Sequence, residues 1–242
     1  MSGVKTSKFS IVKKERFNGK LVTGESFVKI QDSPFKYYNK GISGVEVLYV
    51  EGKYGNNLYI NPNGFPYTNL KLNPFSSRVM AKSHHPPHHA RPSYQLSMLR
   101  ELINLQNSNQ ATVSISNVLL GGIPVYKIDF TVKNYSYKNH TALQTEMLIN
   151  LTDRLNINPK KTLELNSNLY LDSSIKKGSI VKVPSHIGSK VSLYINKATN
   201  YLLMQQTHDE VGLYEEYLYN DFVANPIFSG DEFTEDYKDY GF

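Results

Sequence analysis

Residues 141–186 read TALQTEMLINLTDRLNINPKKTLELNSNLYLDSSIKKGSIVKVPSH, and this stretch predicts a small unit of strand, helix, helix and strand. Its first helix is indicated by Leu148, Leu151 and Leu155, which are spaced so that one face of a helix is apolar. Met147 and Ile149 broaden that apolar face. The spacing therefore predicts an amphipathic helix near the start of the stretch.

A second helix is predicted from Pro159 to Leu165. Proline is favoured at the first position of a helix because its missing N–H would have no partner there, and Asn158 before it is a good N-cap. Asn166 and Ser167 offer side-chain hydrogen bonds that compete with the helical ones, so they end the helix. The alternating run from Ile180 to Val183, closed by a proline, predicts the last strand.

The stretch resembles the LysM domain, a module that binds glycans containing N-acetylglucosamine, such as peptidoglycan and chitin. The residues that carry the resemblance are Ile157-Asn158-Pro159, Leu163, Leu165-Asn166, Leu169, Ile175, Lys177-Gly178 and Ile180 to Pro184. The resemblance implies a sugar groove between two loops, with candidate glycan-binding residues Thr145, Glu146, Met147, Leu148, Ser167, Asn168, Leu169 and Tyr170. The first loop lacks the glycine that most LysM domains have there. A module that packs or binds a protein partner without sugar therefore stays an alternative.

The rest of the chain reads as short strands separated by turn signals such as Asn18-Gly19, which favours a large antiparallel sheet. The predicted strands are Lys8–Lys14, Leu21–Gln31, Gly44–Val50, Leu58–Asn61, Leu70–Leu72, Ala111–Asn117, Ile123–Lys133, Lys190–Lys197, Tyr201–Asp209 and Leu213–Phe222. One helix is expected from Pro92, with Leu96, Leu99, Leu102, Ile103 and Gln106 on the side that faces the sheet. We expect this helix to cover the concave face of the sheet.

This framework resembles a family of secreted bacterial proteins of unknown function related to the LolA and LolB lipoprotein carriers. The residues that carry the resemblance are Lys14–Lys20, Pro34–Tyr38, Gly44–Gly52, Leu70–Pro74, Ser83–His85, Asp209–Phe222, Asn225-Pro226, Phe233-Thr234 and Asp236–Phe242. The resemblance implies an α+β fold, in which a large curved antiparallel sheet, or half-barrel, holds acyl chains under a covering helix. The expected domains are a first half-barrel part at 1–139, an inserted LysM-like βααβ domain at 140–187 and a second half-barrel part at 188–242.

The same resemblance implies that lipid would lie on the inner face of the sheet. The lipid-facing candidates are Val47, Tyr49, Leu96, Leu99, Ile103, Tyr126, Ile128 and Phe130. Alternation along the strands also predicts Phe9, Ile11 and Tyr217 on this inner face. The 18 tyrosines and 11 phenylalanines equally fit a filled aromatic core without a lipid cavity. The aromatic tail at 237–242 is expected to dock on the edge of the sheet.

Composition excludes several classes of protein. The absence of cysteine rules out disulfides, cysteine nucleophiles and thiolate metal sites. A net charge of +6, with dispersed lysines and no recognised nucleic-acid motif, does not indicate a nucleic-acid partner. No secretory signal is visible at Met1-Ser2-Gly3. The glycan-module resemblance nevertheless favours an exported mature region, located in the periplasm or at the outer membrane, over a cytoplasmic protein.

Two possible catalytic or metal sites are weak in the sequence. The run His84-His85-Pro86-Pro87-His88-His89 carries four imidazoles, but its prolines oppose helical spacing and no carboxylate lies close in sequence. We therefore expect no metal and no cofactor. Glu215-Glu216 and Asp231-Glu232 are adjacent pairs whose side chains point to opposite faces of a strand, and no catalytic motif is present. The sequence predicts no catalytic residues.

The leading hypothesis is a non-enzymatic cell-envelope protein that binds peptidoglycan through the module and a lipid, lipoprotein or envelope protein through the half-barrel. The alternative is a structural or assembly subunit that binds protein partners through both parts and takes no small ligand. A glycan hydrolase would need two convergent carboxylates in a cleft, which the sequence does not indicate.

Overall fold

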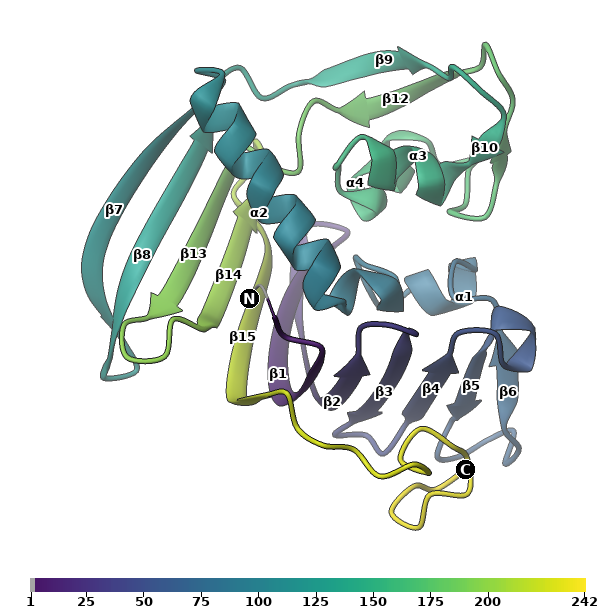
Figure 1. Ribbon diagram of the computed structural model, residues 1–242. Helices are drawn as coiled ribbons and strands as arrows, with labels where there is room; N and C mark the ends of the chain where they lie inside the picture. The colour runs from purple at the N-terminus through teal and green to yellow at the C-terminus, as the bar shows by residue number, and fades with distance from the viewer. Residues whose placement is uncertain (1–2) are drawn as a thin grey trace.

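The computed structural model describes residues 3–242, and its main feature is one curved antiparallel sheet of eleven strands within that range (Figure 1). The strand order is β6-β5-β4-β3-β2-β1-β15-β14-β13-β8-β7. The bounds are β1 Thr6–Phe17, β2 Lys20–Gln31, β3 Lys36–Gly41, β4 Glu46–Val50, β5 Leu58–Asn61, β6 Leu70–Leu72, β7 Ala111–Leu120, β8 Ile123–Val132, β13 Lys190–Asn196, β14 Leu202–His208 and β15 Leu213–Ala224. The predicted large antiparallel sheet is confirmed.

A long helix, α2 (Pro92–Asn107), lies across the concave side of β7, β8, β13 and β14 (Figure 1). It begins at a proline, as predicted. Shorter helical turns precede it in the chain: η1 (Tyr54–Asn56), α1 (Ser77–Met80) and η2 (Pro87–Ala90). In the part of the chain that the structure describes, no helix is both long and apolar enough to cross a bilayer.

The sheet-facing side of α2 agrees only in part with the predicted one: Leu99 and Leu102 pack on the sheet as predicted, whereas Ile103 and Gln106 do not. Leu102 and Leu105 are buried, whereas Ile103 is 43% exposed and Gln106 is also exposed. Met98, Leu99 and Leu102 pack on Phe130 of β8 and on residues of β13 and β14. Apolar residues occupy a wide arc of this helix, so the spacing allows more than one choice of sheet-facing side. Contacts with the sheet determine which side is buried.

The segment between β8 and β13 forms a compact module, hereafter the inserted module, although these two strands are neighbours in the sheet. Its elements are β9 Tyr137–Thr141, β10 Glu146–Met147, α3 Leu148–Arg154, α4 Pro159–Leu165, β11 Ser174–Ile175 and β12 Ile180–Pro184. β12 pairs with β9, and β10 pairs with β11, both antiparallel. The module has its own core, to which α1 contributes Met80; the module's core members are Ala142, Leu148, Ile149, Leu151, Ile157, Leu171, Ile175, Val181 and Val183.

The second helix of the module has the bounds predicted from the sequence. The Asn158 side chain accepts a hydrogen bond from the Lys161 backbone N–H at 3.1 Å, so its predicted role as N-cap is confirmed. The strand that pairs with β12 begins at Tyr137. The limits of 140 and 187 for an inserted domain stay predictions.

One strand of the sheet, β3, is absent from the sequence prediction. Its side chains alternate between the two faces of the sheet, so Tyr37 and Tyr38 point in opposite directions. Tyr37 packs beside Phe35 on the side of α2, and Tyr38 is buried on the other side. Because both faces are covered here, the strand lacks the apolar and polar alternation that identifies a half-exposed strand.

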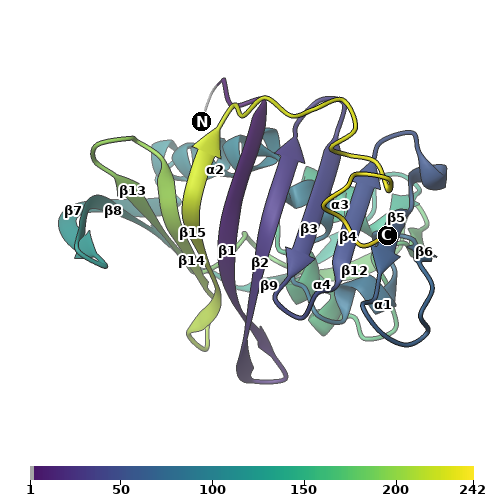
Figure 2. The same cartoon turned by 90° about the horizontal axis from the view of Figure 1, so that it is seen from below.

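The C-terminal residues 225–242 cover the outer face of β3, β4 and β5, opposite the face that carries α2 (Figure 2). Tyr240 stacks on Tyr38 with ring centroids 3.8 Å apart, and Phe233 is 4% exposed. The expectation that the aromatic tail docks on the sheet edge is therefore wrong. Leu48 and Val50 project from the outer face of the sheet. Burial of their apolar surface beneath the tail favours docking on this face over docking on the edge.

We expect Phe233→Ala to lower the free energy of unfolding by about 3–5 kcal/mol, because it opens a cavity beneath the tail. Phe65→Ala is the matched control, since this side chain is 86% exposed, and it should change stability by no more than about 0.5 kcal/mol. Urea unfolding of both variants measures the difference. Equal effects would show that the tail does not contribute a packed layer.

Candidate functional site

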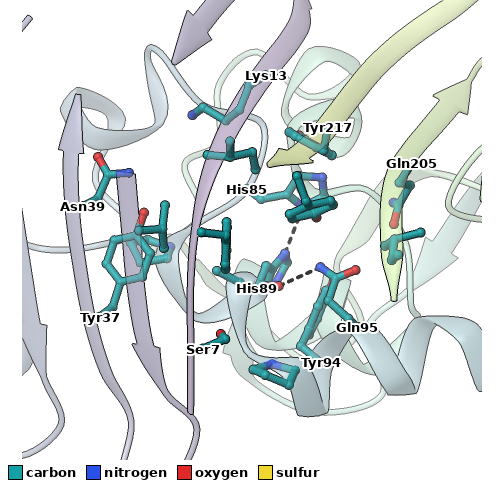
Figure 3. Close-up of a pocket in the computed structure, with 18 of the residues that line it drawn as sticks. Ser7, Lys13, Tyr37, Asn39, His85, His89, Tyr94, Gln95, Gln205 and Tyr217 are labelled. Carbon is teal, nitrogen blue, oxygen red and sulfur yellow. Dashed lines mark hydrogen bonds between the residues drawn. The ribbon is translucent and has the colours of Figure 1, made fainter. Parts of the chain in front are cut away.

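A cavity of about 150 Å³ lies between the start of α2, the η2 turn and the concave face of the sheet (Figure 3). Its apolar wall comes from Phe9 of β1, Val28 of β2, Met98 of α2, Leu202 of β14 and Phe222 of β15. Strands from both halves of the sheet therefore meet at this cavity because β1 pairs with both β2 and β15.

A second hollow of about 50 Å³ continues along α2. The two hollows share Gln95, Met98, Ile187, Leu202 and Gln205, so they are adjacent parts of one groove. The second hollow is otherwise lined by Leu99, Leu102, Val191, Leu193 and Ile195. The residues that line only the second hollow are therefore all apolar.

The other wall of the larger cavity is polar and is centred on Glu215 of β15, whose side chain is 1% exposed. Glu215 Oε2 lies 3.0 Å from His84 Nδ1, 3.0 Å from His85 Nε2 and 3.1 Å from Asn158 Nδ2. The Tyr217 hydroxyl is 3.3 Å from the same oxygen. One buried carboxylate thus joins the sheet, the segment before η2 and the inserted module.

Glu15 of β1 supports this arrangement. Its Oε1 accepts a hydrogen bond from the Tyr217 hydroxyl at 2.7 Å and one from the His84 backbone N–H at 3.1 Å. The second ring nitrogen of His84 faces the Arg16 carbonyl oxygen at 3.0 Å. Both ring nitrogens of His84 therefore lie within hydrogen-bond distance of oxygen atoms, which fixes the orientation of the ring beside Glu215.

The pKa values of Glu215 and His85 reflect their pairing. Burial alone would raise the pKa of Glu215, but the charge of His85 and hydrogen bonds from His84 and His85 outweigh it and hold the pKa well below its usual range. Burial lowers the pKa of His85, but the charge and hydrogen bond of Glu215 raise it more, so the net pKa is raised. Glu215 is therefore an anion at neutral pH, and its negative charge favours the protonated form of His85.

A second group of side chains continues from His85. Its Nδ1 lies 3.0 Å from His89 Nδ1, and His89 Nε2 lies 2.7 Å from Asp153 Oδ1 (Figure 3 shows the contact between the rings). His88 Nε2 lies 2.9 Å from the other oxygen of Asp153, which belongs to α3 of the inserted module. We call Glu15, His84, His85, His88, His89, Asp153 and Glu215 the histidine–carboxylate cluster.

Proton positions in the middle of this cluster follow from its geometry. The Nε2 atoms of His85 and His89 both face carboxylates, so each carries a proton, and the facing Nδ1 atoms share one more. Burial lowers the pKa of His89 to about 3, more than Asp153 raises it. His85 therefore carries the shared proton and donates it to neutral His89. Burial raises the pKa of Asp153, but the hydrogen bonds from His88 and His89 have the larger effect, so the net pKa lies below its usual range.

The module is also held at a second point. Lys161 of α4 donates to Asp209 Oδ2 at 2.9 Å, and the same carboxylate pairs with Arg16 of β1. Burial raises the pKa of Asp209, but its hydrogen bonds from Lys161 and Arg16 lower the net value. Two sets of charged or polar contacts therefore hold the inserted module. Lys161 of α4 contacts Asp209, and Asp153 of α3 contacts His88 and His89.

The structure overturns both reasons for expecting no metal at the histidine run. The η2 turn brings His85 and His89 together, although prolines interrupt the sequence between them. Carboxylates complete the group from Glu15, Asp153 and Glu215, which are distant in sequence. Sequence reasoning missed these partners because nothing in the local pattern indicates which strand or helix packs on the run.

The eight lipid-facing candidates do not line the larger cavity. Leu99 lines the smaller hollow, and Ile128 and Phe130 pack beneath α2. Ile103 and Tyr126 are 43% and 42% exposed. Tyr49 packs on Phe35, and Val47 and Leu96 are half-buried elsewhere. Three residues predicted on the inner face by strand alternation, Phe9, Ile11 and Tyr217, do line the larger cavity.

The eight glycan-binding candidates lie in two segments of the inserted module: 145–148 runs through β10 to the first residue of α3, and 167–170 is the loop after α4. Segment 171–175 follows the second loop, and the Leu148 N–H donates to the Ser173 carbonyl at 2.9 Å beside the β10–β11 pairing. Leu148 is buried, whereas Met147 and Tyr170 are 38% and 53% exposed. Thr145 Oγ1 accepts from the Lys177 N–H at 3.1 Å, and Glu146 pairs with Arg154. Ser167 and Asn168 are exposed, and Leu169 is half-buried.

A family model described as "Protein of unknown function (DUF1571)" matches residues 4–161, more than half of the chain. The chain belongs to the DUF1571 family. The matched residues of this DUF1571 protein run from β1 into α4 and include the whole histidine run and Asp153. No curated protein matches the chain.

Several solved structures are similar to the DUF1571 chain at low identity. A DUF1329 family protein from Desulfovibrio piger is 10% identical, with a TM-score of 0.36 over 96% of this chain and 91% of that one. The lipoprotein LppX from Mycobacterium tuberculosis is 10% identical, with a TM-score of 0.41 over 94% and 90%. A LolA superfamily protein from Nitrosomonas europaea is 9% identical, with a TM-score of 0.34 over 97% and 92%. TM-scores this low carry no argument about function.

We expect Glu215→Gln to lower the free energy of unfolding at pH 7 by about 3–5 kcal/mol, because it removes the buried anion that His84, His85 and Asn158 surround and leaves these groups without their charged partner. The folded-state pKa of Glu215 is lowered, so its contribution is present above the unfolded value of about 4.3 and is lost as the pH falls below it. The difference in the free energy of unfolding between wild type and variant should shrink by up to about 1.4 kcal/mol for each pH unit below that value.

Glu216→Gln is the matched control for this measurement. Glu216 follows Glu215 on β15, but it faces the other side of the sheet and pairs with half-exposed Lys14 at 2.8 Å. Its substitution should cost no more than about 1 kcal/mol. Chemical unfolding at several pH values measures both variants, and a Glu215→Gln effect no larger than that of the control would contradict the buried ion pair.

Proposed function

We propose that this DUF1571 protein is a non-enzymatic cell-envelope protein that binds a lipid or the acyl chain of a lipoprotein in the groove beneath α2. The observation that supports the proposal is the pair of adjacent hollows between α2 and the sheet, which share part of their walls. Apolar side chains line most of it, and a few polar groups converge at one end, as is typical of sites for amphiphilic ligands.

The size of the groove fits a chain better than a compact ligand. A dry cavity of about 150 Å³ holds a molecule the size of benzene, so the larger hollow accommodates only the part of an acyl chain nearest its head group. The rest of the chain would continue past Met98 and Leu202 into the smaller hollow. A filled aromatic core, the alternative considered from composition, would leave no such hollow.

The polar end of the groove would meet the head group. Lys13, His85, Tyr217 and Glu215 line it, and Figure 3 shows Lys13, His85 and Tyr217 around the same space. These side chains supply positive charge and hydrogen-bond donors beside an apolar wall. An amphiphile with an anionic or hydroxyl-bearing head group matches this chemistry.

Two carboxylates do converge here, which a glycan hydrolase would require. Glu15 and Glu215 both lie within hydrogen-bond distance of the Tyr217 hydroxyl. Both are buried, and Glu215 is held as an anion by His84 and His85, so it is poorly suited to act as a general acid. The arrangement supports binding better than hydrolysis.

Met98→Trp is expected to weaken lipid binding at least about tenfold, because the larger side chain fills the junction between the two hollows. Ile103→Trp is the matched control, since Ile103 lies on the same helix but is 43% exposed outside the groove. Displacement of a fluorescent fatty acid from the purified protein measures the affinity of each variant.

Equal affinities of the two tryptophan variants for the probe would contradict the groove as the lipid site. No binding of the probe by the wild-type protein would favour the other hypothesis, a structural or assembly subunit that binds protein partners. Circular dichroism of both variants confirms that each is folded before the comparison.

A second candidate function is peptidoglycan binding by the inserted module. The supporting observation is that Met147 and Tyr170, from the two loops expected to hold sugar, are both exposed beside the paired β10 and β11 segments. An exposed aromatic ring provides an apolar face on which a sugar ring can pack. The backbone donors of Leu148 and Ile149 already serve Ser173 and Leu171, so side chains would provide most of the contact.

Tyr170→Ala is expected to reduce recovery of the protein on purified peptidoglycan at least about fivefold relative to wild type, because it removes the exposed ring from the proposed sugar site of the inserted module. Tyr67→Ala is the control, since Tyr67 is 85% exposed outside the module. Wild-type recovery no better than that of a protein with the module deleted would remove glycan binding while leaving the lipid proposal intact.

A further inference from the structure

The edge of the histidine–carboxylate cluster brings three metal-binding side chains together. His88 and His89 come from the η2 turn, and Asp153 comes from α3 of the inserted module. Their ligand atoms all lie within 4.8 Å of one another. The side chains of His88 and Asp153 are 25% and 30% exposed, so an ion from solvent can reach them, whereas His89 is buried.

We propose that His88, His89 and Asp153 bind a divalent transition-metal ion, with Zn²⁺ as the best fit, at the junction between the sheet and the inserted module. The site shares His89 with the wall of the larger hollow, but its ligand atoms face Asp153, and the proposal does not depend on lipid binding. Two imidazole nitrogens and one carboxylate oxygen are a common protein donor set for zinc, with water as the fourth ligand. Hard cations such as Mg²⁺ prefer an all-oxygen site and would bind poorly.

The present spacing of the ligand atoms is close to what an ion requires. The Nε2 atoms of His88 and His89 lie 2.9 and 2.7 Å from the two oxygens of Asp153. Ligands about 2.0 Å from a tetrahedral zinc ion are roughly 3.3 Å apart. Each ring nitrogen must therefore move about half an ångström from the Asp153 oxygen that it now contacts, and the side chains must turn so that one carboxylate oxygen faces the ion. The partial exposure of His88 and Asp153 allows this shift without repacking the core.

The groups behind the ligands form the support that metal-bound histidines normally have. With Nε2 of His89 on the ion, its Nδ1–H would donate to His85 Nδ1, which is 3.0 Å away. His85 Nε2–H would in turn donate to Glu215, also at 3.0 Å. A chain of carboxylate, imidazole, imidazole and metal orients the ligand and makes it more basic.

Aromatic neighbours fix the two ligand rings. Tyr94 stacks on His89 with centroids 3.8 Å apart and an interplanar angle of 13°, and Phe75 meets His88 edge-on at 5.5 Å. Rings held in this way lose little conformational entropy when they bind an ion. Because Asp153 belongs to the module and the histidines do not, a bound ion would link the two parts directly.

The test is a calorimetric titration of the full chain, free of any histidine tag, with Zn²⁺ and separately with Mg²⁺. We expect one zinc ion per chain and no magnesium binding. His88→Gln and Asp153→Asn should each weaken zinc binding at least about 100-fold. His85→Gln, which leaves the three ligands in place but also removes the contact with Glu215, should weaken it about 10- to 100-fold in a chain whose fold is checked by circular dichroism.

His186→Gln is the matched control, because His186 lies outside the cluster and its ring contacts Ser185. Its zinc affinity should equal that of the wild type. The visible spectrum of the Co²⁺-loaded protein should show the intense bands of tetrahedral coordination, and His88→Gln should remove them. The His88 side chain is 25% exposed, so we expect the His88→Gln variant to fold. Circular dichroism of this variant checks the fold before the titration.

Absence of zinc binding by the wild-type chain would overturn the proposal. Zinc affinity that is unchanged in both His88→Gln and Asp153→Asn would overturn it as well, because the ion would then lie elsewhere. Neither result affects the lipid proposal, whose variants lie in the groove.

Discussion

The buried carboxylate of Glu215 is the interaction on which the arrangement of this protein depends. A charge removed from water is tolerated only if opposite charges and hydrogen bonds surround it. Here those partners come from three places: His84 and His85 precede η2, Asn158 starts α4, and Tyr217 lies on the same strand. The segment before η2 and the inserted module therefore both contact the sheet through this one anionic group, and the Lys161–Asp209 pair adds a second point of attachment for the module.

This constraint also shapes the groove. His85, His89 and Glu215 line the larger hollow, and His89 contacts Asp153 of the module on its other side. The polar end of the proposed lipid site and the junction with the module thus share the same rings. A ligand head group that contacts His85 would act on the hydrogen bonds that position the module, so binding in the groove and docking of the module are physically connected.

Local features of the fold could be predicted from the sequence. The bounds of α4 follow from Pro159 and its N-cap Asn158, and β5 has the predicted limits, because caps and turns depend on neighbouring residues. The strand β3 could not be identified in this way. Its Tyr37 and Tyr38 are covered on opposite faces by segments far away in the chain, so the pattern that marks a strand is absent.

The candidate site shows the same limit more strongly. The histidine run is visible in the sequence, but its partners lie 64 and 65 residues away at Asp153 and 130 or more residues away at Glu215. Likewise, strand alternation placed Phe9 and Tyr217 on the inner face, whereas the position of α2 over the sheet decides which inner residues line a hollow. Tertiary packing, which periodicity does not encode, determines both outcomes.

Native mass spectrometry of the protein purified from the membrane fraction of cells that produce it tests the central claim most directly. We expect a folded species heavier than the polypeptide by the mass of one lipid, and release of that mass when the protein is unfolded. A folded species with the mass of the polypeptide alone, under conditions that preserve known lipid complexes, would rule out lipid binding in the groove.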